Sequence, residues 1–110
     1  MAQYAIMIFE SKTPGGWADL PPEVMAAHEQ FPGKIEELGG KIVNGFALEP
    51  AGTARGVRGE VVTDGPFLES KEVLGGFFVI EARDIEHATA IAKLTPIASG
   101  GVEVRPLLSA

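Results

Sequence analysis

The sequence predicts an α+β sandwich in which two helices cover one face of a single sheet. Two observations predict this fold class. Apolar runs typical of strands alternate with two segments of helical periodicity, and each helical segment is followed by two glycines and another strand. The chain thus consists of two strand–helix–strand halves, which together form a ferredoxin-like βαββαβ sandwich, here with an added hairpin. The expected strands are residues 4–9, 41–50, 73–81 and 102–107.

The first strand, residues 4–9, is a nearly unbroken apolar run, as in a strand covered on both faces. The first helix begins at Pro21 and Pro22, because proline suits the first helical turn. Pro32 donates no hydrogen bond within this helix, so we expect a kink or break near residues 29–32. The inward face of the helix has the spacing +4, +3, +4, +3 and consists of Val24, His28, Phe31, Ile35 and Leu38.

The remaining elements follow from turn and cap signals. In the second strand, 41–50, Gly45 is a candidate bulge. Residues 53–64 indicate a hairpin that turns around Arg58-Gly59. Asp84 is a suitable N-cap for the second helix. The residues of that helix expected to face inward are Ile85, Ala88, Ile91 and Ala92, and His87 is expected to be exposed.

Length and composition exclude several classes of protein. The 110 residues fit one domain, residues 1–110, and 45% of them are hydrophobic, as in an ordinary globular protein. The formal net charge of −6 argues against nucleic acid or an anionic membrane as a partner. The absence of cysteine and the presence of only two histidines argue against a metal site. The N-terminus lacks the pattern of a signal peptide, so we expect a cytoplasmic protein.

The face of the sheet opposite the helices needs a cover. Right-handed crossovers place both helices on the same face, which leaves the other face of an apolar sheet exposed. In so small a chain, a second copy of the molecule supplies that cover most economically. We therefore expect a homodimer.

The segment Thr63–Glu72, "TDGPFLESKE", carries more chemistry than a plain loop needs. Asp64 and Gly65 form a tight-turn pair, and the following proline keeps the chain out of helical geometry. Phe67 is expected to enter the core and fix the turn. In an extended chain, Glu69 and Lys71 lie on one side, within reach of the Asp64 carboxylate.

This segment resembles the DGPF branch of the YCII-related proteins. The resemblance rests on Asp64-Gly-Pro-Phe67 followed by "LESKE" and "LGGFFVIE", and it extends from "YAIMIFE" to "GGVEVRPL". It implies a ferredoxin-like fold that dimerises into an α/β barrel. Fold relatives of this family include lactone isomerases and monooxygenases that bind an organic substrate between sheet and helices. DGPF proteins are also often associated with extracytoplasmic-function sigma factors, which implies a regulatory alternative.

The resemblance also implies roles for individual residues. His28 matches the histidine of YCII-type proteins and would act as a general base, with Asp64 as its carboxylate partner. The helix departs from that pattern, because it carries Glu36 and Glu37 where an orienting aspartate is expected. The alternative for His28 is a buried ring satisfied by a carbonyl group. The alternative for Asp64 is a turn residue whose carboxylate caps its own backbone.

Two further groups keep two interpretations each. Glu69 and Lys71 either bind a substrate carboxylate or tune Asp64, or else form an ion cluster that holds a dimer together, and Phe67 is a further candidate for substrate binding. Gly75 and Gly76, inside a strong strand, mark either a bulge or the close approach of a ligand or another backbone. The sequence thus leaves open a small-molecule binding protein, a regulatory protein and a structural homodimer. If it is an enzyme, we expect proton transfer on an unsaturated or aromatic acid, without metal or organic cofactor.

Overall fold

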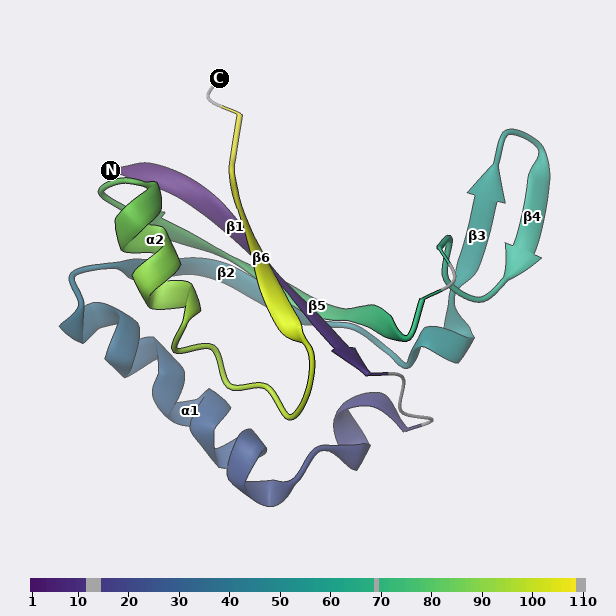
Figure 1. The fold of residues 1–110 in the computed structure, drawn as a ribbon, viewed down its shortest axis with the longest axis horizontal. Coiled ribbons are helices and arrows are strands. Elements are labelled where there is room, and N and C mark those ends of the chain that lie inside the picture. The colour runs from purple at the N-terminus through teal and green to yellow at the C-terminus, as the bar shows by residue number, and fades with distance from the viewer. Residues whose placement is uncertain (12–14, 69, 109–110) are drawn as a thin grey trace.

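The computed structural model describes residues 1–11, 15–68 and 70–108. It is an α+β fold with one four-stranded sheet, one separate hairpin and two α-helices (Figure 1). In chain order the elements are β1 (Ala2–Ser11), the 3-10 helix η1 (Gly16–Asp19), α1 (Pro22–Glu37), β2 (Lys41–Ala47), the 3-10 helix η2 (Ala51–Thr53), β3 (Arg55–Arg58), β4 (Val61–Asp64), β5 (Glu72–Ala82), α2 (Ile85–Ala92) and β6 (Gly101–Pro106).

The sheet has the strand order β2-β5-β1-β6, and all of its neighbouring strands are antiparallel. This is the order of two interleaved strand–helix–strand halves, so the ferredoxin-like prediction is confirmed. Both α-helices lie on one side of the sheet, and the β3–β4 hairpin projects away from them (Figure 1). The hairpin turns at Gly59, whose φ of 60° is a left-handed conformation that glycine adopts readily.

The core lies between the two helices and the face of the sheet that they cover. Alternation along β1 and β5 directs every second side chain to this face. The opposite face, here called the outer face, carries the partly buried residues Ala5, Met7, Phe77 and Val79. The buried core residues are Tyr4, Ile6, Ile8, Phe31, Ile35, Phe78, Ile80, Ala82, Ala88, Ile91 and Ala92.

Helix α1 runs continuously through Pro32, so of the kink or break expected near residues 29–32 the break is not observed. Phe31 and Ile35, on either side of the proline, are both buried against the sheet, and this packing outweighs one missing hydrogen bond. The helix ends as the two glycines predict. Gly39 has a φ of 84°, and the Gly40 N–H donates to the Ile35 carbonyl at 3.0 Å. Among the described residues, no helix has both the length and the apolar character needed to span a membrane.

Helix α2 confirms the Asp84 cap and corrects the placement of two residues. The Asp84 carboxylate accepts a hydrogen bond from the His87 N–H at 2.8 Å. The His87 side chain is buried, contrary to expectation, because its ring joins the two helix ends. Its Nδ1 accepts from the Arg83 N–H at 3.0 Å, and its Nε2 lies 2.6 Å from the Leu38 carbonyl and donates to it. Ile85, expected to face inward, is 38% exposed.

Candidate functional site

A pocket of about 210 Å³ lies between the middle of α1, strand β2 and the middle of β5. Its walls are aromatic and aliphatic, and His28 contributes an imidazole to them. Pockets for small molecules are typically concave and mostly apolar, with few polar groups that fix the ligand. The lining residues are Ile8, Trp17, His28, Phe31, Pro32, Ile42, Gly45, Phe46, Ala47, Phe77 and Phe78.

Small residues in the sheet leave this space open. Gly45 pairs with Phe78, and Ala47 pairs with Gly76, so all four positions lie on the face that the helices cover. Three of the four carry at most a methyl group, so the sheet sends little side-chain volume toward α1 at this end. The ladder between β2 and β5 shifts register between Ile42 and Asn44, so the bulge lies before the predicted position at Gly45.

Trp17 forms one wall of the pocket and is fixed by a hydrogen bond. Its indole Nε1 donates to the Gly75 carbonyl at 3.3 Å, and its ring centroid lies 4.7 Å from that of His28. The same carbonyl accepts from the Leu48 N–H at 2.9 Å. Gly75 is the extra residue in β5, because β1 pairs Ile8 with Gly76 and the next residue with Leu74. The bulge interpretation is thus confirmed, and it presents a carbonyl that holds Trp17.

Gly76 has a separate reason to be glycine. A Cβ at this position would lie 2.8 Å from the Phe46 carbonyl oxygen and 3.4 Å from the Ala47 Cα. Both atoms belong to the backbone of the adjacent strand, so the close approach of another backbone is confirmed as well. Glycine here lets β2 and β5 meet at the mouth of the pocket.

His28 is partly buried in the pocket wall, on the inward face of α1. Burial lowers the pKa of its imidazole below the usual value of 6.5, and a hydrogen bond to the Pro96 carbonyl opposes this shift in part. The ring is therefore neutral at pH 7. With one ring N–H donating to Pro96, the other nitrogen keeps its lone pair and is able to accept a proton or a hydrogen bond.

We predict that the His28 imidazole titrates below pH 6.5. Because the pKa is lower in the folded than in the unfolded state, the stability contributed by the neutral ring is present above pH 6.5 and is lost as the pH falls through the folded pKa. NMR detection of the ring C–H protons during a pH titration measures the midpoint, with the variant His28→Gln used for assignment. A midpoint at or above 6.5 would contradict the placement of this ring in an apolar wall.

Asp64 lies at the end of the hairpin, outside the set of residues that line the pocket. Its side chain is 91% exposed and forms an ion pair with Arg55 at 3.4 Å. The carboxylate cannot cap the backbone two residues later, because that residue is Pro66, which has no N–H to donate. The turn is held instead by the Gly65 N–H, which donates to the Ala54 carbonyl at 2.8 Å, and by a φ of 94° at Gly65. The structure therefore does not bring Asp64 and His28 together within one chain.

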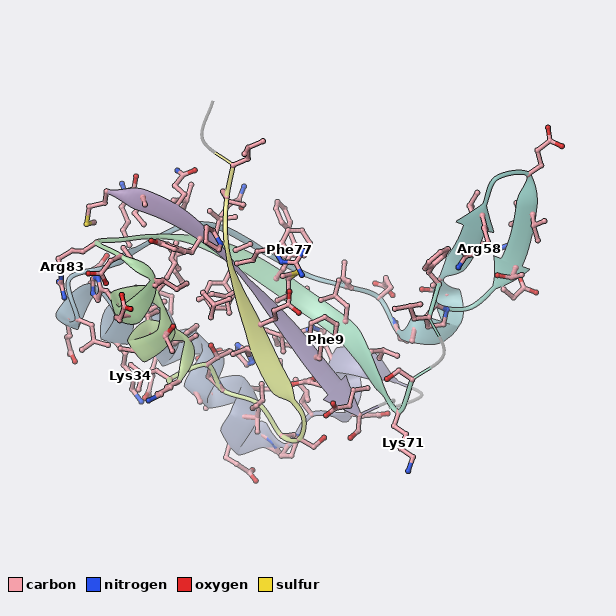
Figure 2. All side chains as sticks on the ribbon, turned by 45° about the horizontal axis from the view of Figure 1, so that its top comes forward. Phe9, Lys34, Arg58, Lys71, Phe77 and Arg83 are labelled. Carbon is pink, nitrogen blue, oxygen red and sulfur yellow. The ribbon has the colours of Figure 1, made fainter. Side chains whose placement is uncertain are left out.

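The other candidate residues of Thr63–Glu72, here called the DGPF segment, also lie away from His28. Phe67 is 54% exposed, so the prediction that it enters the core is wrong. The reason is that its ring packs beneath the Arg58 guanidinium, at 4.5 Å, instead of reaching the sheet. Lys71 is exposed and points away from the body of the molecule, near the start of β5 (Figure 2). Glu69 lies outside the described residues.

The family model of the YCII-related domain matches residues 5–109, which include most of β1, the pocket and β6. The chain belongs to the YCII-related family. A relative in Rhizobium meliloti (strain 1021) is 33% identical over 112 residues, covering 94% of this chain and 90% of the relative. That relative is described as an uncharacterised protein, so it assigns this YCII-related chain no activity.

Sequence reasoning identified His28 but missed the groups around it. Trp17 is the single tryptophan of the chain, and its partner became apparent only in three dimensions. The Pro96 carbonyl comes from the segment between α2 and β6, 68 positions away from His28. Within the described part of the chain, no three His, Asp or Glu side chains form a group suited to a metal ion.

Proposed function

We propose that this YCII-related protein binds a small organic molecule in the pocket beneath α1, with His28 as the proton acceptor. The observation that carries the proposal is the His28 imidazole in the wall of an aromatic pocket, 4.7 Å from the Trp17 ring between centroids; burial lowers its pKa, which favours the neutral form. A general base needs a lone pair at neutral pH, and His28 supplies one beside space for a ligand.

The chemistry that this arrangement supports best is an isomerase-like proton transfer. The His28 lone pair takes a proton from a carbon or oxygen of the ligand, and the electron pair stays on the ligand. The imidazolium then returns the proton to a different atom. Among the residues that the structure describes, no second titratable side chain lines this pocket, so His28 performs both transfers. Trp17 fixes the position of the ring from one side.

A thermal-shift screen of small phenols, lactones and aromatic acids tests the proposal. The screen compares the wild-type protein with Ala47→Leu, which fills the pocket, and with Ala90→Leu, a matched change on the exposed side of α2. A ligand at one hundred times its dissociation constant stabilises the folded state by about 2.7 kcal/mol. We expect hits with the wild type and Ala90→Leu that disappear in Ala47→Leu.

The alternative location for a ligand is the DGPF segment. The variant Asp64→Asn distinguishes the two places, because Asp64 does not line the pocket. A hit that survives Ala47→Leu and is lost in Asp64→Asn would refute the pocket beneath α1 as the site.

We further propose that the outer face and the hairpin form a homodimer interface. The hairpin exposes three valines, Val57, Val61 and Val62, by 58%, 63% and 59%. A two-stranded hairpin is marginally stable in water, so these side chains require packing. Asp64, Phe67 and Lys71 would then belong to the interface, the second of the two roles that the sequence leaves open for this segment.

If the protein is a homodimer, light scattering at micromolar concentration should give twice the mass of one chain. Met7→Lys places a charge on the outer face and is expected to shift the protein toward monomer by at least tenfold in dissociation constant. Ala26→Lys, on the exposed side of α1, is the matched control and is expected to leave the mass unchanged. A monomeric wild type would instead leave the hairpin free for a different protein, as the regulatory alternative requires.

A further inference from the structure

In the part of the chain that the structure describes, the lining of the pocket beneath α1 carries no ionised acid or base. Among the described residues that line it, none is Lys, Arg, Asp or Glu. The two side chains there with polar nitrogens are Trp17 and His28. The indole N–H is already taken by the Gly75 carbonyl, and one imidazole N–H by the Pro96 carbonyl.

The free polar atom of this pair is therefore an acceptor, the second nitrogen of His28. A ligand that hydrogen-bonds to it must bring a donor, because the imidazole nitrogen that carries no hydrogen can only accept. A carboxylate brings no donor and would also enter an apolar pocket without a cation to pair with it. An ammonium group would lack an anion at the same place.

We propose that the ligand is an uncharged, one-ring aromatic or enolic molecule with a single O–H group directed at His28. This inference rests on the proposed function and narrows it, since it replaces the expected unsaturated or aromatic acid by a phenol or enol. The O–H donates to the His28 lone pair, and the ring packs among the aromatic side chains of Trp17, Phe31 and Phe78.

The size of the pocket agrees with one ring. A cavity of roughly 150 Å³ lined by Leu, Ile and Phe holds benzene, and this pocket measures about 210 Å³. The additional space corresponds to a few substituent atoms. Phe31 and Phe78, whose rings form a T-shaped contact with centroids 5.3 Å apart, both line this space.

The test uses four probes of equal ring size: 4-methylphenol, toluene, 4-methylbenzoate and 4-methylbenzylamine. Calorimetric titration at pH 7.5 measures the affinity, and the fluorescence of Trp17, the single tryptophan, reports whether the probe enters this pocket. We expect 4-methylphenol to bind most tightly. Toluene should bind about tenfold more weakly for want of one hydrogen bond, and the charged probes at least about a hundredfold more weakly.

The variant His28→Phe removes the acceptor and keeps an aromatic wall. In this variant, 4-methylphenol should bind no more tightly than toluene does. Preferred binding of 4-methylbenzoate or 4-methylbenzylamine, with a change in Trp17 fluorescence, would overturn the uncharged ligand and leave the proposed function intact. If none of the four probes binds while the wider thermal-shift screen finds a ligand at this pocket, the one-ring class is wrong. If that screen finds no ligand at the pocket, the proposed function fails as well.

Discussion

Replacing His87 with alanine is expected to lower the free energy of unfolding by about 3 kcal/mol. The buried imidazole bridges the two helix ends, since it accepts from the Arg83 N–H and donates to the Leu38 carbonyl. Its removal leaves both backbone groups without this partner and opens a void beneath the C-terminus of α1. Urea denaturation followed by circular dichroism measures the change.

Glu86→Ala is the matched control for this prediction. Glu86 is the preceding residue in the same helix turn and is exposed, so its loss should change the unfolding free energy by less than about 0.5 kcal/mol. If both substitutions lower the free energy of unfolding equally, the hydrogen bonds of His87 contribute nothing specific to stability.

Replacing Gly76 with alanine is expected to destabilise the protein by about 2 kcal/mol and to weaken ligand binding in the pocket beneath α1. The new methyl group would lie 2.8 Å from the Phe46 carbonyl oxygen, so β2 must move away from β5. Because Phe46 and Ala47 line the pocket, this movement changes its shape. Denaturation curves and the thermal-shift hits of the variant measure the two effects.

Gly75→Ala is a control one residue away. The nearest atoms to a Cβ at Gly75 are a Glu10 carboxylate oxygen at 3.7 Å and the Ile8 carbonyl oxygen at 4.0 Å, which are ordinary contacts. We expect a loss of less than about 1 kcal/mol for this variant. A Gly75→Ala protein that is as unstable as Gly76→Ala would contradict the account of the strand contact.

The sheet and helices were predictable because the spacing of apolar residues agreed with the cap and turn residues that mark the ends of the helices. Apolar runs rich in strand-forming residues predicted β1 and β5, and the glycines after Leu38 and the cap at Asp84 predicted the adjacent helix ends. The prediction was wrong where a local rule competed with tertiary packing. The helix continues through Pro32 because Phe31 and Ile35 bury their side chains, and His87 is buried because its ring fits between two helix ends.

The candidate site was predictable only in part. Helical spacing placed His28 on the inner face of α1, which is the wall of the pocket. The DGPF segment drew attention through its turn chemistry and charges, but its described residues lie on and beside the projecting hairpin. On the β2 side the pocket is lined by the small residues Gly45 and Ala47, and no pattern in the sequence distinguishes a glycine that lines a pocket from one that forms a bulge.

The most direct test of the central claim is an NMR map of ligand contacts on the ¹⁵N-labelled protein. Saturating 4-methylphenol, or any hit from the thermal-shift screen, is added and the amide and indole signals are compared. We predict that the largest shifts occur at the Trp17 indole N–H, which borders the pocket, and at the amides of Gly45 and Phe46. Shifts concentrated instead at Asp64–Phe67, with the Trp17 indole signal unchanged, would contradict the assignment of the His28 pocket as the binding site.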